Sequence, residues 1–167
     1  TYMIAGAVTK GDVTVKNARP DHIVAVIDKL KETGVSIRIK DNEIRVWAER
    51  KLKPLYLTTL AYPRFPTDSQ AQMMTLMSVT EGISVITEKI FPDRFMHISE
   101  LNRMGAEIAL EGPSAIIKGV SSLSGAPVMA SDLRASAALV LAGLVAKGKT
   151  EISRIYHLDR GYERLEE

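Results

Sequence analysis

The chain has 167 residues, of which 46% are hydrophobic and 25% are charged, a composition typical of one globular domain or one lobe of a larger protein. Its 22 basic residues against 20 acidic ones give a net charge of +2, which argues against binding of nucleic acid by bulk charge. The chain has no cysteine, which excludes disulfides, thiolate metal sites and a cysteine nucleophile within it, and its three histidines are too dispersed for a short zinc-binding motif.

No apolar run in the sequence approaches the roughly 18 residues that a membrane-spanning helix needs. Residues 1–9 are apolar but lack the basic lead of a signal peptide. We therefore expect a cytoplasmic protein that contacts neither membrane nor nucleic acid and that uses no metal or cofactor.

The first half of the chain predicts a strand, a helix, a hairpin, a strand and a second helix, in that order. Hydrophobic residues recur at helical spacing between residues 23 and 30, and Gly34 follows where a left-handed C-cap is expected. Alternating hydrophobic residues flank the turn at Asp41-Asn42 and predict the hairpin. The expected elements span residues 13–15, 23–34, 35–39, 44–46, 55–58 and 67–80.

The second half of the chain predicts the same series of elements. A strand at 83–86 is followed by a helix that ends at Gly105, a turn at 111–113 with a returning strand at 115–118, and a helix at 131–145. Each of three helices is expected to open at or near an aspartate, since acidic residues are favourable at helix N-termini. These aspartates are Asp21, Asp93 and Asp159.

A short motif also recurs, because AGAVTKG at residues 5–11 and AGLVAKG at 142–148 share five of seven positions. We interpret the whole chain, 1–167, as a single lobe with two complete repeat units, at about 13–82 and 83–149, and a partial unit at each end. The alternative is chance similarity between α/β segments. A helix that opens at Asp159 and stops at Glu167 is marginal on its own, so we expect the chain to be cut from a longer one.

Three arginines are expected in the first turns of helices, where a basic residue is unfavourable unless an anion binds. They are Arg94, Arg134 and Arg160, and each closely follows an aspartate, Asp132 in the case of Arg134. A phosphate or carboxylate held by several guanidinium groups would explain their positions. The alternative is a surface ion pair between each arginine and its neighbouring aspartate.

Asp68 is a second candidate, since it follows the proline-containing loop AYPRFP at a strand-to-helix junction. A carboxylate in this position could accept a proton from a sugar hydroxyl. Thr67 and Gln70 have the spacing of a capping box. The alternative is that Asp68 only stabilises the helix N-terminus.

Three stretches of the sequence carry a family signature: AYPRFPTDSQAQ at 61–72, ASDLRASAALVLAGLVAKGKT at 130–150 and HLDRGYERLEE at 157–167. They resemble the bacterial UDP-N-acetylglucosamine enolpyruvyl transferases, also called UDP-N-acetylglucosamine 1-carboxyvinyltransferases. The resemblance covers essentially the whole chain. It implies an α/β (α+β) fold of the inside-out barrel type, in which each of two lobes contains three βαβαββ units, and it assigns this chain to the lobe with the C-terminal part of the enzyme.

The resemblance also implies a reaction, the transfer of the enolpyruvyl group of phosphoenolpyruvate to the 3′-hydroxyl of UDP-N-acetylglucosamine with release of phosphate. This addition and elimination through a tetrahedral ketal is the first committed step of peptidoglycan synthesis. By resemblance, Asp68 is the general base that binds the sugar hydroxyl and the backbone near Ile90 contacts the nucleotide sugar. The remaining substrate-binding residues implied by the family are Arg94, Asp132, Arg134 and Arg160.

The family also uses a loop cysteine, a lysine and further arginines from its other lobe, and this chain contains none of that lobe. We therefore expect the missing lobe as a partner and no turnover from this chain alone. Three alternatives stay open: a 5-enolpyruvylshikimate-3-phosphate synthase, a non-catalytic nucleotide- or RNA-binding domain of the same repeat fold, and a purely structural lobe.

Overall fold

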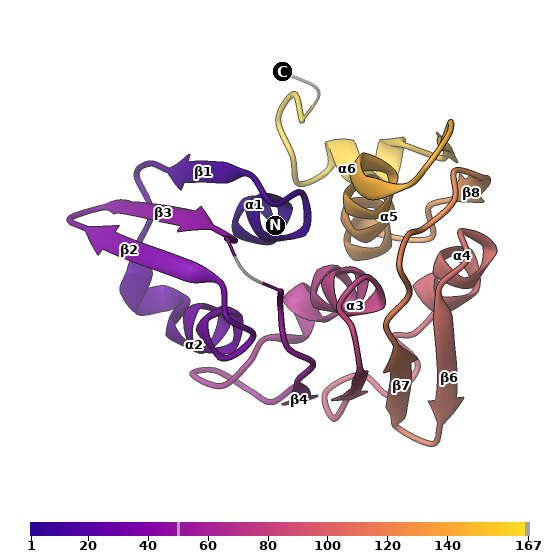
Figure 1. The fold of residues 1–167 in the computed structure, drawn as a ribbon, viewed down its shortest axis with the longest axis horizontal. Coiled ribbons are helices and arrows are strands. Elements are labelled where there is room, and N and C mark those ends of the chain that lie inside the picture. Colours follow the sequence, from indigo (N-terminus) through magenta and orange to yellow (C-terminus); the bar gives the residue numbers. More distant parts are fainter. Residues whose placement is uncertain (50, 166–167) are drawn as a thin grey trace.

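The computed structural model describes residues 1–49 and 51–165, and it has three helices at its centre with β-sheets outside them (Figure 1). The central helices pack against one another and are seen end-on in Figure 1. They are α1 (Tyr2–Val8), α3 (Gln70–Ser78) and α5 (Leu133–Val145). The predicted α/β class is confirmed. None of the described helices is long and apolar enough to cross a membrane.

The central helices can lie in the interior because their sequences are almost free of charged residues. All nine residues of α3 are buried, and α5 contains a single charged residue, Arg134, in its first turn. Four residues of α3 are polar but uncharged, and it is charged residues that are almost never fully buried without a partner. The alanines of α5 let α3 approach closely, and the Thr75 hydroxyl donates a hydrogen bond to the carbonyl of Ala138 at 3.1 Å.

The strands of the described residues form three sheets around these helices. The first is antiparallel with the order β1-β3-β2, the second has the order β4-β5-β7-β6 with only β4 and β5 parallel, and the third is the parallel pair β8-β9. The strands are β1 (Asp12–Val15), β2 (Ser36–Lys40), β3 (Glu43–Trp47), β4 (Tyr56–Thr58), β5 (Ile83–Thr87), β6 (Glu107–Glu111), β7 (Ser114–Lys118), β8 (Pro127–Met129) and β9 (Glu151–Ser153).

The element order strand, helix, hairpin, strand, helix occurs twice, from β1 to α3 and from β5 to α5. The boundaries of the sheets do not coincide with the boundaries of these two series. β4 belongs to the first series but pairs with β5 of the second. The second and third sheets therefore join consecutive series, whereas the first sheet contains strands of the first series alone. The division of the chain into repeat units at 13–82 and 83–149 stays a prediction.

The outer helices α2 (Val24–Glu32) and α4 (His97–Arg103) end as predicted, with Gly34 and Gly105 at φ of 96° and 87°. Their predicted starts are wrong. Asp21 lies in a separate 3-10 turn, η1 (Pro20–His22), and pairs with Arg19 at 2.8 Å. Asp93 lies in a turn that ends before His97. In both cases a turn that begins at the proline intervenes before the helix, so neither aspartate caps it.

The C-terminal helix differs from the prediction. The short α6 (Tyr156–Asp159) ends at Asp159, which the sequence pattern placed at a helix start, and Glu166-Glu167 lie outside the described residues. Leu158 is the buried residue of α6, which packs on α5. The N-terminal residue contacts the segment after α6, because Thr1 forms a hydrogen bond with Tyr162.

Candidate active site

Asp68 projects from a short 3-10 helix, η2 (Thr67–Ser69), that joins β4 to α3. Pro66 enters this helix in an extended conformation, and buried Phe65 anchors the preceding loop, where its carbonyl accepts a hydrogen bond from the Leu60 N–H at 3.0 Å. The Asp68 side chain is 64% exposed. A packed loop therefore holds an accessible carboxylate at the N-terminal end of a buried helix.

Two of the predicted arginines converge on Asp68. The Nε of Arg134 lies 2.6 Å from Asp68 Oδ1, and the Nη1 of Arg94 lies 3.3 Å from the same oxygen. The other carboxylate oxygen, Oδ2, accepts no hydrogen bond from residues 1–49 or 51–165. Because the arginine side chains are only 18% (Arg94) and 31% (Arg134) exposed, their charges are less screened than those of surface pairs.

The two arginines reach this position from different kinds of element. Arg134 lies in the first turn of α5, as predicted. Arg94 was predicted in a first turn too, and that is wrong, because it lies in the turn before α4. Its guanidinium carbon sits 4.0 Å from the centre of the Phe91 ring, which fixes the side chain without a helix.

Asp132 has the contacts of a helix cap. Its Oδ1 accepts hydrogen bonds from the N–H groups of Arg134 at 2.7 Å and Ala135 at 2.9 Å. These bonds satisfy two of the free N–H groups at the start of α5 and fix the backbone from which the Arg134 side chain extends. A direct substrate contact by Asp132 stays a prediction.

Arg160 is exposed and follows α6, not a helix start, so its predicted place in a first turn is wrong. Its side chain makes no hydrogen bond or ion pair with the part of the chain that the structure describes. The next residue, Gly161, lies so close to Leu133 that an added Cβ would be 2.7 Å from the leucine side chain. Arg160 is therefore the residue before Gly161, which contacts Leu133, and Leu133 directly precedes Arg134 at the start of α5.

The predicted capping box is wrong. Thr67 is not the N-cap of α3, and its hydroxyl instead donates to Glu88 Oε2 at 2.8 Å and accepts from Arg94 Nη1 at 3.0 Å. The side-chain amide of Gln70 is fully buried and has no hydrogen-bond partner among the described residues. The 3-10 turn η2 separates Thr67 from the helix start, which moves its hydroxyl away from the α3 N–H groups.

Glu88 was not recognised in the sequence. It directly follows β5, is fully buried, and accepts hydrogen bonds from two hydroxyls and two backbone N–H groups. Burial raises the pKa of the Glu88 carboxyl, but the hydrogen bonds from Thr59, Thr67 and the two N–H groups outweigh burial, so the pKa lies below its usual value. A charged residue after an apolar strand gives no signal that distinguishes it from a solvent-exposed loop residue.

Ile90 belongs to the loop that Glu88 holds. Its N–H donates to Glu88 Oε1 at 2.8 Å, while its carbonyl oxygen accepts no hydrogen bond within the described residues. The Ile90 N–H is thus satisfied by Glu88, whereas the Ile90 carbonyl has no donor among the described residues and can accept a hydrogen bond.

His97 lies behind the start of α5. It is 3% exposed, and its Nε2 has no hydrogen-bond partner among the described residues. Burial lowers the pKa of His97 from 6.5 to about 4, although the charge of Asp132 acts in the opposite direction. The imidazole is therefore neutral at neutral pH.

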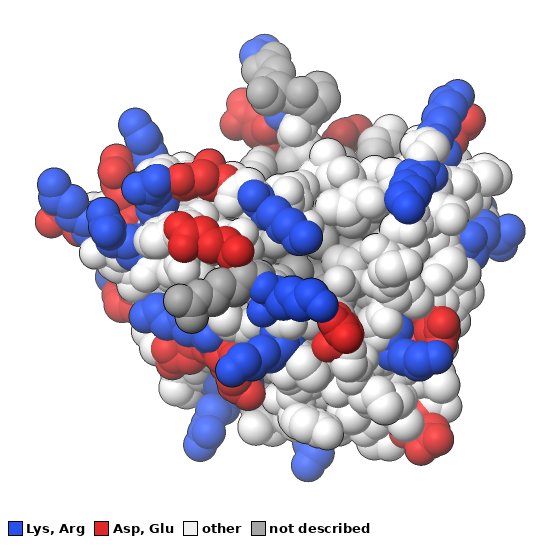
Figure 2. Space-filling model, viewed as in Figure 1, with Lys and Arg blue, Asp and Glu red and all other residues white. Residues whose placement is uncertain are grey.

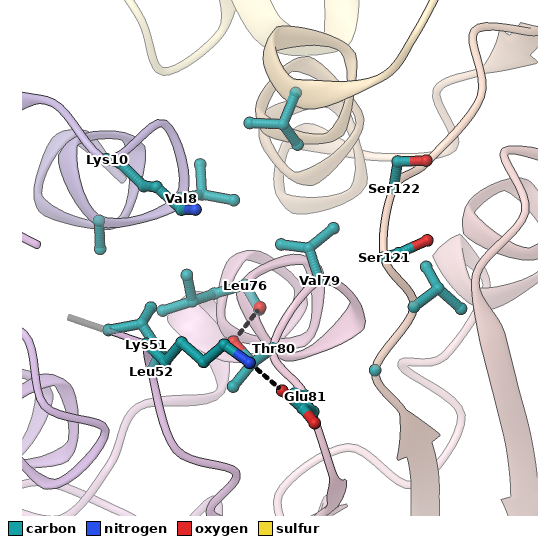
Figure 3. A pocket seen from close by; sticks show the side chains of 14 residues that line it. Val8, Lys10, Lys51, Leu52, Leu76, Val79, Thr80, Glu81, Ser121 and Ser122 are labelled. Carbon is teal, nitrogen blue, oxygen red and sulfur yellow. Dashed lines mark hydrogen bonds and ion pairs between the residues drawn. The ribbon is translucent and has the colours of Figure 1, made fainter.

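A pocket of about 420 Å³, shown in Figure 3, lies at the C-terminal ends of the central helices, whereas Asp68 precedes the N-terminal end of α3. Val8, Val79 and Val145 line it, from the C-terminal ends of α1, α3 and α5. At its rim, Lys51 pairs with Glu81 at 2.9 Å, and both side chains are highly exposed. The pocket and the Asp68 cluster are separate features.

Charged side chains of both signs are intermixed near the β1–β3–β2 sheet on the face shown in Figure 2, and the surface over α5 is largely uncharged. Among residues 1–49 and 51–165 no group of three or more histidine or acidic residues could hold a metal ion. The Asp68 cluster instead combines one exposed carboxylate with two partly buried guanidinium groups, an arrangement suited to an anion and a hydroxyl.

The sequence profile of the EPSP synthase family (3-phosphoshikimate 1-carboxyvinyltransferase) matches residues 1–167. The chain belongs to the EPSP synthase family. Within this family it is 60% identical, over its full length, to a UDP-N-acetylglucosamine 1-carboxyvinyltransferase of Desulfosudis oleivorans. It is 55% identical, over 99% of its length, to the enzyme of the same name from Myxococcus xanthus. The chain spans 40% of the length of each of these curated relatives.

Solved structures of the family have the same fold. The enolpyruvyl transferase NikO from Streptomyces tendae matches 96% of the chain with a TM-score of 0.88 and 27% identity, and 39% of its own chain is covered. The EPSP synthase from Acinetobacter baumannii matches 90% of the chain with a TM-score of 0.67 and 22% identity, with 37% of its own chain covered. At that lower identity the similarity concerns the fold alone.

Proposed function

We propose that this chain supplies half of the active site of an enolpyruvyl transferase that uses phosphoenolpyruvate and UDP-N-acetylglucosamine. The observation that carries the proposal is the convergence of Arg94 and Arg134 on the exposed carboxylate of Asp68. It is supported by the 60% identity to a UDP-N-acetylglucosamine 1-carboxyvinyltransferase, a name that includes both the acceptor and the transferred group.

The arginines bind the anionic donor. Phosphoenolpyruvate carries a carboxylate and a phosphate, and planar guanidinium groups pair with both kinds of oxyanion through two parallel hydrogen bonds. Arg160 completes the set, since it has no ion pair among the described residues and is adjacent to the Gly161–Leu133 contact. Fixed cations also stabilise the charge that develops as the ketal forms and phosphate leaves.

Asp68 acts on the acceptor as the general base. Both arginines bind its Oδ1, and Oδ2 accepts no hydrogen bond from the described residues, so this oxygen is available to take the proton of the 3′-hydroxyl. The carbonyl of Ile90, which is also without a donor in the described chain, binds the nucleotide sugar. Asp132 contributes to substrate binding by fixing the backbone of Arg134.

The rest of the site comes from a second lobe with a catalytic cysteine loop. Support comes from the length of the relatives, of which this chain spans 40%. The chain alone therefore shows no turnover, and the complete protein carries out the first committed step of peptidoglycan synthesis in the cytoplasm, with roles in cell-wall formation, cell shape and division.

The experiment replaces Asp68 by Asn in the complete protein and measures phosphate release with both substrates. Asparagine keeps an oxygen for the arginines but cannot accept a proton, so kcat is expected to fall about 10²-fold or more. Asp28→Asn, at an exposed position on α2, is the control for the loss of one negative charge and keeps wild-type kcat.

Two results would contradict the proposal. One is an unchanged kcat in Asp68→Asn, which would remove the general base. The other is a wild-type protein that releases phosphate with shikimate 3-phosphate as acceptor but not with UDP-N-acetylglucosamine, which would assign the chain to the other branch of the family.

A further inference from the structure

The carboxylate of Glu88 connects three separate segments next to Asp68. Its Oε1 accepts hydrogen bonds from the Thr59 hydroxyl at 2.5 Å, at the end of β4, and from the N–H groups of Ile90 at 2.8 Å and Phe91 at 3.1 Å. Its Oε2 accepts from the Thr67 hydroxyl at 2.8 Å, in the residue before Asp68. One side chain thus holds the strand end, the Asp68 turn and the Ile90 loop.

The link continues from Thr67 to the candidate site. The Thr67 hydroxyl donates its single proton to Glu88, so its lone pairs are left to accept from Arg94 Nη1 at 3.0 Å. The same Nη1 reaches Asp68 Oδ1 at 3.3 Å. The direction of every hydrogen bond in this series follows from an ionised carboxylate at its inner end, because that group only accepts.

Stability alone does not explain a carboxylate here. Glu88 is fully buried and forms no ion pair among residues 1–49 and 51–165, so its charge is desolvated and compensated only by neutral donors. A glutamine would turn an N–H group toward one partner. If that partner were Thr67, the hydroxyl would accept from the amide, and its own proton would lose the carboxylate acceptor that now sets its orientation toward Arg94.

We propose that Glu88 is a positioning residue, which acts through Thr67 to hold the Arg94 guanidinium in the orientation that binds the anionic substrate. The inference rests on the proposed function and adds a residue that touches no substrate. Phe91 supports the same orientation from the other side, because its N–H is bound by Glu88 and its ring lies 4.0 Å from the guanidinium carbon.

The test removes the hydroxyl of Thr67, which lies between Glu88 and Arg94 in this series of hydrogen bonds. Thr67→Val keeps the shape of the side chain but removes the hydroxyl, and Thr67→Ser keeps the hydroxyl. In the complete enzyme, Thr67→Val is expected to raise the KM for phosphoenolpyruvate about tenfold or more, with a smaller change in the KM for UDP-N-acetylglucosamine. Thr67→Ser should restore most of the wild-type value, and Glu88→Gln should resemble Thr67→Val.

A matched control is Thr87→Val in β5. Thr87 is also partly buried and loses one hydroxyl bond, to Ser114 at 2.8 Å, but it lies outside the link to Arg94. It is expected to keep the wild-type KM for phosphoenolpyruvate. If Glu88→Gln fails to fold, Thr67→Val still tests the link, with its thermal midpoint compared to that of Thr87→Val.

The inference is overturned if Thr67→Val keeps the wild-type KM for phosphoenolpyruvate, or if Thr87→Val raises it equally. A wild-type enzyme without turnover would contradict the proposed function instead. The same variants would then be titrated calorimetrically with inorganic phosphate. Weaker binding by Thr67→Val than by Thr67→Ser would support the inference, and equal binding would overturn it.

Discussion

Two buried ionisable side chains, Glu88 and His97, respond to burial in opposite ways. Glu88 stays charged because four donors surround its carboxylate, which lowers its pKa despite desolvation. His97 stays neutral because burial lowers its pKa to about 4, and its Nε2 has no hydrogen-bond partner within the described chain. For a buried residue, hydrogen bonds to the charged form can offset the desolvation that otherwise favours the neutral form.

The pKa of His97 predicts a loss of stability in mild acid. Between about pH 6.5 and 4 the unfolded chain takes up a proton on His97 and the folded chain does not, so the free energy of unfolding falls as the pH falls through this window. From pH 7 to 5 the loss attributable to His97 is about 2 kcal/mol. Urea unfolding at the two pH values measures it.

His97→Gln is expected to remove that part of the pH dependence, and His22→Gln, at an exposed position, to leave it unchanged. Comparing the variants removes the effect of the other groups that titrate in acid, because those groups are the same in each protein. Glu88 is one of them, and its contribution to the free energy of unfolding is lost only as the pH falls toward its own lowered pKa. An equal loss of stability in wild type and His97→Gln would show that His97 is accessible to protons in the folded state.

Residue-level prediction from sequence succeeded where local geometry fixes the side chain. Arg134 lies in the predicted first turn, and Asp68 lies at a loop-to-helix junction between Pro66 and α3. Sequence reasoning could not find Glu88 or the new role of Thr67, because their partners come from segments about 20 to 30 residues away along the chain. Such contacts leave no periodic signal in the sequence.

At the scale of elements, helix C-termini were easier to predict than N-termini. Gly34 and Gly105 adopt positive φ, a conformation that few other residues tolerate, so the sequence marks these ends clearly. An aspartate near a helix start is ambiguous, because the same residue favours turns. Asp132 caps α5, whereas Asp21 and Asp159 lie in a separate turn and at a helix end.

The difference between these aspartates predicts different stabilities. Asp132→Ala removes two hydrogen bonds at the start of α5 and is expected to lower the free energy of unfolding by about 1 kcal/mol. Asp159→Ala removes an acidic residue from a helix C-terminus, where it is unfavourable, and should change stability by less than about 0.5 kcal/mol. Urea denaturation of both variants measures the difference, and equal effects would contradict the cap assignment.

At the scale of the whole molecule, the central helices connect the sheets and separate two surfaces. The Asp68 cluster lies at the N-terminal ends of α3 and α5, and the pocket of about 420 Å³ lies at their C-terminal ends. The sequence repeat predicted the series of elements but not the pairing of β4 with β5. Which strands pair across two series depends on how the central helices pack, and the local sequence pattern does not specify it.

One continuous set of buried side chains runs from the first sheet through α3 to β6 and β7, and this continuity predicts cooperative unfolding. Trp47, the only tryptophan, reports on the β1–β3–β2 sheet, and far-ultraviolet circular dichroism reports on all elements. Met74→Ala, at a fully buried position of α3, is expected to lower stability by about 2–5 kcal/mol and to shift both signals to the same lower urea concentration. Met96→Ala, at a position 55% exposed, is the control and should shift neither signal appreciably. Separate midpoints for fluorescence and circular dichroism would mean that the first sheet unfolds independently of α3, and the central helices would then not be the element that unites the molecule.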